Sequence, residues 1–368
     1  MHHGMLTVYK EAGYTSSDAV ARLRGILRMR RIGHTGTLDP DAEGVLPMCL
    51  GNATRICELI ADREKEYVAL MRLGVLTDTQ DMSGEILHKI PDEEIPAMIL
   101  KSGMKAPLQM EPGTRETAVN QAEEYMHGKD EEKLITDSIL RTAAAFIGQI
   151  EQVPPMYSAI KVNGKRLYDM ARKGITVERK PRSITIHALE IEKIELPFIT
   201  MRVRCSKGTY IRTLCEDMGN ALGTGAAMQS LLRTRVGQFT LHEAHTLDEL
   251  EHFAKNEPDR LLPLIRPVDS FFADLPAAAC TEDALRLLKN GNLLTTEEFR
   301  FLSEEEDPQR EWRSGEVFDL QSLPGVNPGE QVIRMYSADR SFYGLYRNKA
   351  GSRDRSRYSA YKMFLPEL

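Results

Sequence analysis

The feature that most constrains the fold is a continuous strand–turn–helix pattern over residues 198–222. The segment FITMRVRC (198–205) alternates apolar and polar side chains, which is the period of a half-buried strand. SKGT (206–209) supplies a turn, and apolar residues then recur at helical spacing over 210–222. Further strands are expected over 66–76 and 183–194, and further helices over 15–27 and 134–148. Strands and helices mixed along the chain in this way predict an α+β fold.

Composition places the chain among ordinary globular proteins. Its 368 residues suffice for two domains, and 42% hydrophobic with 28% charged residues argues against disorder. No apolar run approaches the roughly 20 residues of a membrane helix, and the N-terminus lacks the basic and apolar regions of a secretory signal. The five cysteines are odd in number and widely spread, which argues against a disulfide framework or a cysteine zinc site. We therefore expect a cytoplasmic protein without membrane association.

A segment with four prolines, 256–276, divides the chain, and we interpret it as a linker. Residues 1–255 then form the larger domain, and 277–368 form a small β-rich domain. Within the larger domain, Gly and Pro interrupt 33–47, so this stretch is expected to be loop-rich. The acidic, proline-containing segment 92–133 is interpreted as an insertion between core elements.

The net charge of −6 conceals an uneven distribution. Segments 92–133 and 297–316 each carry a net −5, whereas 161–182 carries +6 and 347–362 carries +5. Both basic runs are interleaved with tyrosines, a combination that favours a polyanion partner. A solvated basic face is the alternative for any single run. The helix over 15–27 also has a basic outer surface, formed by Arg22, Arg24, Arg28, Arg30 and Arg31.

The stretch GHTGTLDP (33–40) contains residues that can do chemistry. Its glycines permit a positive φ or the close approach of a ligand. Pro40 favours extended geometry at Asp39, so that the carboxylate projects from the turn. A single carboxylate on a rigid loop suits a nucleophile or an acid–base catalyst. The alternatives are a turn-stabilising role for Asp39 and a hydrogen-bonded loop histidine at His34.

A second candidate lies at CSKGTYIRT (205–213). A strand, a glycine turn and the start of a helix can present backbone N–H groups to an anion. Lys207 and Arg212 add positive charge, and Tyr210 adds a stacking surface. The alternative is a basic corner with Tyr210 packed in the core.

Five blocks resemble the TruB family of bacterial tRNA pseudouridine synthases and occur in that family's order. The first, GHTGTLDPDAEGVLPMCLGNATR (33–55), matches the family's core pattern GHTGxLDPxAxGVLPxxxGxATK. The others are KEYVALMRLGVLTDTQDMSG (65–84), PPMYSAIKVNGKRLYDMARKGI (154–175), CSKGTYIRTLCEDMG (205–219) and LLRTRVGQF (231–239). Together they span most of residues 4–250. The C-terminal domain, through LKNGNLL (288–294) and SFYGLYRNKAGSRDRSRYSAYKMF (341–364), resembles a degenerate PUA-type RNA-binding domain.

The resemblance implies a role for each matched residue. Asp39 corresponds to the catalytic aspartate, and Arg212 to the arginine that pairs with it. Tyr67 corresponds to the tyrosine that stacks on the target base and is a candidate for handling the C5 proton. The remaining pocket residues implied are Tyr210, His34 beside the flipped nucleotide, and Leu232 against the uracil.

The same resemblance implies an RNA-binding thumb over 152–182, the segment in which the charge count finds its largest basic excess. The residues expected to contact RNA are Lys161, Lys165, Arg166, Arg172 and Lys173, together with Lys207. The acidic segments 92–133 and 303–316 depart from the family pattern. We expect both to face away from the RNA phosphates.

The implied reaction isomerises a uridine of the tRNA T-arm, at position 55 of the TΨC loop, to pseudouridine. The N1–C1′ bond breaks, the base turns, and C5 joins C1′, so that neither a cofactor nor a metal is required. The target base must leave its stack to reach the carboxylate. We expect a monomer without an obligatory protein partner. Two alternatives are a tRNA-folding chaperone with incidental catalysis and a guide-RNA-dependent synthase.

Overall fold

The computed structural model describes residues 3–103, 131–158, 160–162, 164–175, 177–313, 320, 323–348 and 356–365. For 161, 162, 165 and 166 it describes the backbone only. Most of the predicted insertion 92–133 and part of the basic run 347–362 therefore lie outside the described residues. Among the helices that are described, none is long and apolar enough to cross a bilayer.

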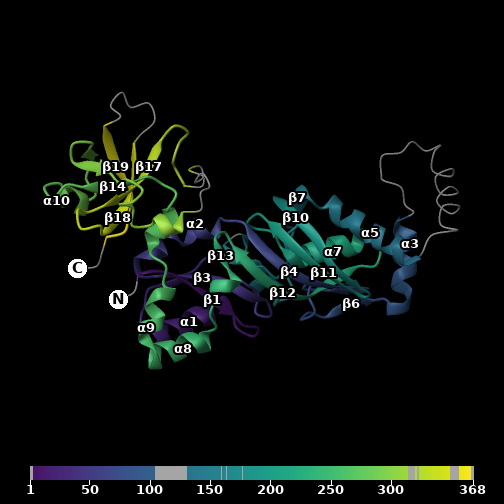
Figure 1. The fold of residues 1–368 in the computed structure, drawn as a ribbon. Helices are drawn as coiled ribbons and strands as arrows, with labels where there is room; N and C mark the ends of the chain where they lie inside the picture. Colours follow the sequence, from purple (N-terminus) through teal and green to yellow (C-terminus); the bar gives the residue numbers. More distant parts are fainter. Residues whose placement is uncertain are drawn as a thin grey trace.

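A nine-stranded sheet forms the larger domain (Figure 1). Neighbouring strands are antiparallel except for β3 and β12, which run parallel, so the sheet is mixed. In spatial order its strands are β1 (Gly4–Lys10), β3 (Glu43–Leu50), β12 (Ala226–Val236), β4 (Lys65–Leu73), β11 (Phe198–Cys205), β10 (Arg182–Glu195) and β7 (Gly148–Gln152); β2 (Ile32–His34) also pairs with β3, and β13 (Phe239–Thr240) with β12. The α+β prediction is confirmed.

Helices pack against the two halves of this sheet. One hydrophobic cluster joins α7 (Ile211–Ala221) and α5 (Glu131–Ala145) to β4, β10, β11 and β12. Another joins α1 (Ser16–Leu27) and α8 (Leu247–Asn256) to β1 and β3. A capping box fixes the start of α1, because Thr15 and Asp18 satisfy each other's backbone N–H groups. The remaining helices are α2 (Cys57–Ala61), α3 (Ile95–Gly103), α6 (Leu167–Ala171), α9 (Pro258–Leu261) and α10 (Leu285–Lys289).

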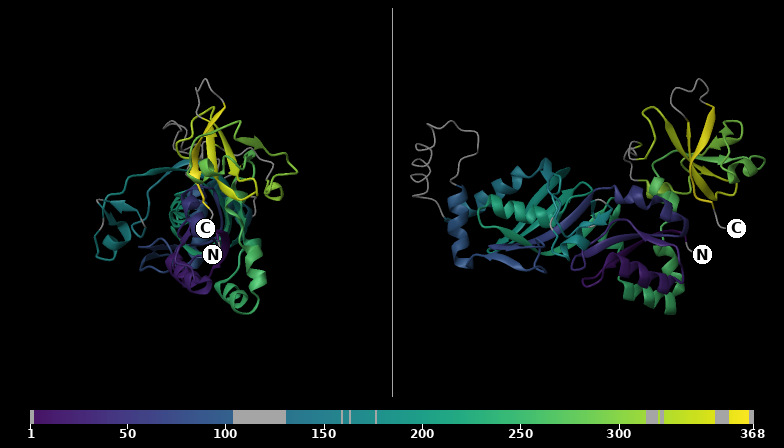
Figure 2. Two further views of the ribbon diagram at one scale, coloured as in Figure 1. Left: turned by 90° about the vertical axis from the view of Figure 1, so that its left-hand side faces the viewer. Right: turned by 180° about the vertical axis from the view of Figure 1, so that it is seen from behind.

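The C-terminal domain is β-rich, as predicted. Its six-stranded sheet lies at one end of the larger domain in Figure 1 and in the right-hand view of Figure 2. In spatial order the strands are β15 (Leu294–Thr295), β19 (Arg357–Met363), β18 (Phe342–Asn348), β17 (Gln331–Tyr336), β14 (Ala277–Cys280) and β16 (Phe299–Phe301). Two hairpins complete the described strands: β5 (Val75–Thr77) with β6 (Ile86–Lys89), and β8 (Lys161–Val162) with β9 (Lys165–Arg166).

The two domains share a hydrophobic core. Met5 and Cys49 of the large sheet belong to one buried cluster with Leu345 and Phe364 of the C-terminal sheet. The segment 256–276 joins the domains as a packed structure, because Met5 and Arg266 exchange two backbone hydrogen bonds of 2.8 Å. The C-terminal domain is therefore docked on the nine-stranded sheet by apolar contacts.

Two sequence expectations need correction. The stretch 33–47 is not loop throughout, since β3 begins at Glu43 and includes both Gly44 and Pro47. The segment 92–133 is not wholly an insertion, because α3 places Ile95 and Ile99 in the main core with no exposed surface. The described part of this segment through α3 therefore belongs to the core.

Candidate active site

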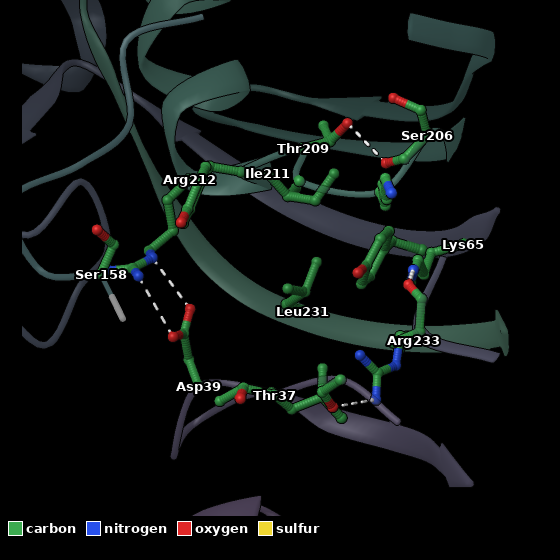
Figure 3. Close-up of a pocket in the computed structure, with 17 residues that line it drawn as sticks. Thr37, Asp39, Lys65, Ser158, Ser206, Thr209, Ile211, Arg212, Leu231 and Arg233 are labelled. Carbon is green, nitrogen blue, oxygen red and sulfur yellow. Dashed lines mark hydrogen bonds and ion pairs between the residues drawn. The ribbon is translucent and has the colours of Figure 1, made fainter. Parts of the chain in front are cut away.

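A cavity of about 260 Å³ opens between the loop before β3, strands β4 and β12, and the start of α7 (Figure 3). Five of the residues predicted from the sequence line it, although they are far apart along the chain. These residues are Asp39, Tyr67, Lys207, Tyr210 and Arg212. The fold therefore assembles most of the predicted pocket in one place.

Asp39 and Arg212 form an ion pair at the edge of this cavity (Figure 3). Arg212 Nε lies 3.0 Å from Asp39 Oδ2, and its Nη2 donates to Oδ1 at 3.3 Å. The guanidinium is 7% exposed and the carboxylate 40% exposed. Burial raises the pKa of Asp39 above its ordinary value, and the Arg212 charge opposes this rise. Two contacts from one planar fork also fix the direction of the carboxylate.

A second carboxylate holds Arg212 from its other side. Asp81 Oδ2 accepts from Arg212 Nη1 at 3.3 Å. The other oxygen, Oδ1, accepts from the backbone N–H of Ser83 at 3.0 Å and from the hydroxyl of Thr79 at 2.7 Å. Asp81 thus closes the turn after β5 and also orients Arg212. The proximity of Asp81 adds to the rise in the pKa of Asp39.

A buried lysine holds the Asp39 loop in place. Lys10 has no exposed surface, and its ammonium donates to the carbonyls of Tyr14, Pro40 and Glu11 at 2.6, 2.9 and 3.0 Å. Burial lowers its pKa to about 8. Because one of the three carbonyls belongs to Pro40, the lysine ties β1 to the residue that follows Asp39.

The inner wall of the cavity carries basic groups around Tyr67. Arg233 is 1% exposed, and it donates to the carbonyls of Val45 at 2.8 Å and Gly36 at 3.3 Å. Lys65 is also buried, and burial lowers its pKa to about 8. Burial raises the pKa of Tyr67 to about 12, so its hydroxyl stays protonated at neutral pH. This tyrosine therefore presents a neutral aromatic ring rather than a phenolate.

Two predicted residues lie outside the cavity lining. Leu231, and not Leu232, points into the cavity from β12 (Figure 3). The period of two along this strand puts Leu231 and Arg233 on one face and Leu232 on the other. His34 lies at the end of β2 and lines a neighbouring surface depression. Its Nδ1 accepts from the Gly36 N–H at 3.3 Å, and burial lowers its pKa.

The start of α7 is clamped to β7. Gln152 Oε1 accepts from the Tyr210 N–H at 2.8 Å, and Gln152 Nε2 donates to the Tyr210 carbonyl at 3.0 Å. Since Arg212 lies only two residues further, this reciprocal pair also positions the ion pair. Lys207, at the mouth of the cavity, pairs with Asp62 at 2.8 Å.

The structure gives only part of the predicted thumb surface. Arg172 and Lys173 are exposed, and the Arg172 guanidinium lies 5.5 Å from the centre of the Tyr168 ring. The side chains of Lys161, Lys165 and Arg166 lie outside the described residues. At the root of the thumb, the Tyr157 carbonyl accepts from Arg212 Nη2 at 2.9 Å.

Sequence reasoning missed several residues that shape the site. Arg233 and Leu231 could have been found from the alternation within LLRTRVGQF, which gives the face of the strand. Lys65 lies within the matched KEY block, two positions from Tyr67. Lys10 and Asp81 carried no individual signal, because their contacts join segments that are distant in sequence.

Family models match most of the larger domain. The model "TruB family pseudouridylate synthase (N terminal domain)" matches residues 24–107 and 107–211, and "tRNA pseudouridylate synthase B C-terminal domain" matches 212–273. A tRNA pseudouridine synthase B of Lachnoclostridium phytofermentans is 39% identical over 371 residues, or 99% of this chain and 100% of that protein. Another, of Clostridium tetani, is 38% identical over 289 residues, or 78% of this chain and 84% of that protein.

Solved structures share the fold across both domains. A chain of an H/ACA ribonucleoprotein bound to a substrate RNA containing 2′-deoxyuridine aligns with a TM-score of 0.60 at 22% identity, covering 99% of this chain and 86% of that one. A chain of a Cbf5–Nop10–Gar1 complex aligns with a TM-score of 0.58 at 24% identity, covering 99% and 85%. The fold is therefore shared with these two chains. Together with the sequence matches, it shows that the chain belongs to the TruB family of pseudouridylate synthases, which are isomerases.

Proposed function

We propose that this protein isomerises uridine 55 in the TΨC loop of tRNA to pseudouridine, with Asp39 as the catalytic carboxylate. The named relatives, tRNA pseudouridine synthases B, support tRNA as the substrate. The observation that carries the proposal is the Asp39–Arg212 pair at the edge of the cavity. The cavity has a volume of about 260 Å³, just below the roughly 300–1,000 Å³ of typical small-molecule pockets, and this size suits one flipped base.

The surrounding residues suit the steps of this reaction. Arg212 keeps the partly exposed Asp39 carboxylate ionised and directed into the cavity. An ionised oxygen in this place can act on the sugar C1′ or on the base while the N1–C1′ bond breaks. Tyr67, protonated and buried, offers a ring on which the extruded uracil stacks. Leu231 takes the place predicted for Leu232 on the wall of the uracil pocket.

The basic segments then serve recognition of the folded T-arm. RNA loops are recognised by stacking, shape and backbone contacts, which suits a thumb over 152–182 with interleaved tyrosines. We assign the same kind of role to the C-terminal domain, 277–368, as a PUA-like module. Its basic side chains on β18 and β19 include Arg347, which lies 5.5 Å from the Tyr361 ring centre.

The test is pseudouridine formation in an unmodified tRNA transcript, with the purified chain and no added protein or cofactor. Asp39→Asn changes only the charge of the carboxyl group, and the matched control is Asp41→Asn on the same loop, at an exposed position. We expect product at position 55 with the wild type and with Asp41→Asn. Asp39→Asn is expected to lower the rate at least about 10³-fold.

The outcomes separate the candidate functions. Tight tRNA binding by the wild type without product would favour a folding chaperone over an enzyme with this substrate. A requirement for an added guide RNA or protein would contradict the proposal that the chain acts alone. Sedimentation of the active protein at one chain mass is expected, since we propose a monomer.

A further inference from the structure

An open depression lies beside the catalytic cavity, where α1 ends and β2 begins. The residues that line it are Arg24, Arg30, Arg31, Ile32, Gly33, His34, Thr54 and Cys57. Three arginines and one histidine thus meet at this depression, and no acidic residue of the described chain lines it.

The three arginines carry charge that the described parts of the chain do not compensate. None of Arg24, Arg30 and Arg31 forms an ion pair there, although each is exposed. Arg22 of α1 contrasts with them, since it pairs with both Asp248 and Glu251 of α8. The paired arginine serves the packing of two helices, whereas the others face solvent around the depression.

Two of these side chains are held in position by neutral groups. Arg31 Nε donates to Thr54 Oγ1 at 2.8 Å, and that hydroxyl donates to the Gly51 carbonyl at 2.8 Å. Arg24 Nη2 donates to the Ile32 carbonyl at 3.1 Å. Each guanidinium keeps further N–H groups for a ligand, and a planar fork with free donors recognises phosphate oxygens well.

The depression also adjoins the catalytic cavity along the chain. His34 lines the depression, and Gly36, Thr37, Leu38 and Asp39 line the cavity. The short segment 34–36 therefore separates the two hollows. Phosphates flank each base of an RNA strand, so a strand whose base enters the cavity is expected to carry its neighbouring phosphates toward the adjacent depression.

We propose that the depression binds phosphate groups of the RNA strand directly adjacent to the target nucleotide, through Arg24, Arg30 and Arg31. This inference rests on the proposed function, because it takes the RNA to be the one whose uridine enters the cavity. It assigns to Arg24, at the end of α1, and to Arg30 and Arg31, which follow the helix, a role in the affinity for the RNA strand.

The variant Arg30→Gln/Arg31→Gln tests the inference by binding to a T-arm hairpin at several salt concentrations. We expect Kd to rise at least about tenfold at low salt, and the slope of log Kd against log salt to fall by about 0.9 per lost phosphate contact. Arg28→Gln is the matched control, because Arg28 is exposed at the same helix end but does not line the depression. It should change Kd less than about twofold, with the slope unchanged.

Two further variants guard against misfolding. In Arg30→Gln alone, the side chain that is replaced makes no hydrogen bond among the described residues. This variant should show a smaller rise in Kd and a smaller fall in the salt slope than the double variant. Arg30→Lys/Arg31→Lys restores the charges and should recover most of the salt slope. At saturating RNA, the single-turnover rate should match the wild type in every variant, since none of these side chains lies in the cavity.

Neutral methylphosphonate linkages, placed one at a time in the hairpin, locate the contact. Wild type should lose affinity at linkages next to the target uridine, and Arg30→Gln/Arg31→Gln should be insensitive at those same linkages. The inference would be overturned if both proteins were equally sensitive at every linkage, or if Arg30→Gln/Arg31→Gln and Arg28→Gln had equal Kd values. In either case, product formation by the wild type would still support the proposed function. Absence of product with the wild type would instead refute the proposed function.

Discussion

The position of Arg212 between two carboxylates predicts pH effects of opposite sign for two substitutions. Arg212→Met removes the positive charge that opposes the rise in the pKa of Asp39. An adjacent cation lowers the pKa of a carboxyl group by about 1–3 units, so its loss raises the pKa by a similar amount. If ionised Asp39 is required, activity is lost as pH falls through this pKa. The acidic limb of the rate profile should therefore move to higher pH by about 1–3 units.

Asp81→Asn should move the same limb the other way. The Asp81 charge contributes to the raised pKa of Asp39, so its neutralisation lowers that pKa. The asparagine Oδ1 can still accept from Ser83 and Thr79, which preserves the turn. We expect a shift to lower pH that is smaller than the shift for Arg212→Met, because the Asp81 charge affects the pKa of Asp39 less than the Arg212 charge does.

The assay is single-turnover pseudouridine formation with enzyme in excess over a tRNA transcript, between pH 5 and pH 9. Arg22→Met is the control, since Arg22 also lies between two carboxylates, Asp248 and Glu251, but on the helices α1 and α8. It should leave the acidic limb in place. A rate for Arg212→Met that falls equally at every pH, with the limb unmoved, would refute the electrostatic role assigned to Arg212.

Two predictions concern stability. Asp307→Asn leaves the fully buried Arg334 without its ionic partner. It should lower the free energy of unfolding, measured by urea denaturation, by about 3–5 kcal/mol. Glu306→Gln, at the more exposed pair with Arg300, is the control, and an equally small loss for both variants would contradict this prediction. Gly44→Ala should lower both Tm and activity, because the φ of Gly44 is +106° and a Cβ atom there would lie 2.3 Å from the Arg233 carbonyl oxygen. Gly25→Ala on α1 is the control: a Cβ atom there meets open space, so this change should stabilise the protein by about 0.5–1 kcal/mol. An unchanged Tm for Gly44→Ala would show that β3 can move away from β12.

Periodicity predicted the elements whose pattern is local. The strand 198–205, the turn after it and the helix of 211–221 are found where the alternation and spacing placed them. The start of α1 was likewise readable from its capping residues. In these segments, local preference and tertiary packing agree.

The same local rules misread β3. Gly44 and Pro47 count as strand breakers, yet both lie within this strand. Gly44 is needed because the backbone of Arg233 approaches it too closely for a side chain. The Pro47 carbonyl accepts from the Thr35 N–H at 3.2 Å, so the residue still takes part in pairing. Close approach of distant strands decides this region, and no local pattern reports it.

For the site, residue chemistry alone left functional and structural interpretations of Asp39 open. The family resemblance selected Asp39, Arg212 and Tyr67, and the fold brings them to one cavity. Asp81 shows why other residues of the site were missed in the sequence. In sequence it belongs to a turn cluster, and the turn is real, since its Oδ1 closes it. The second oxygen of the same carboxylate bonds Arg212, and only the folded chain reveals that contact.

Arg212 also connects the Asp39 pocket to the segment 152–182, which we propose as an RNA-binding thumb. Its guanidinium is 7% exposed and donates to the Tyr157 carbonyl at 2.9 Å, in addition to its contacts with Asp39 and Asp81. If the chain at Tyr157 moved away, a buried N–H group would lose its acceptor, at a cost of about 1–3 kcal/mol. The position of the thumb root is therefore stabilised from within the active site. Any displacement of that root changes the hydrogen bonding of the group that orients Asp39.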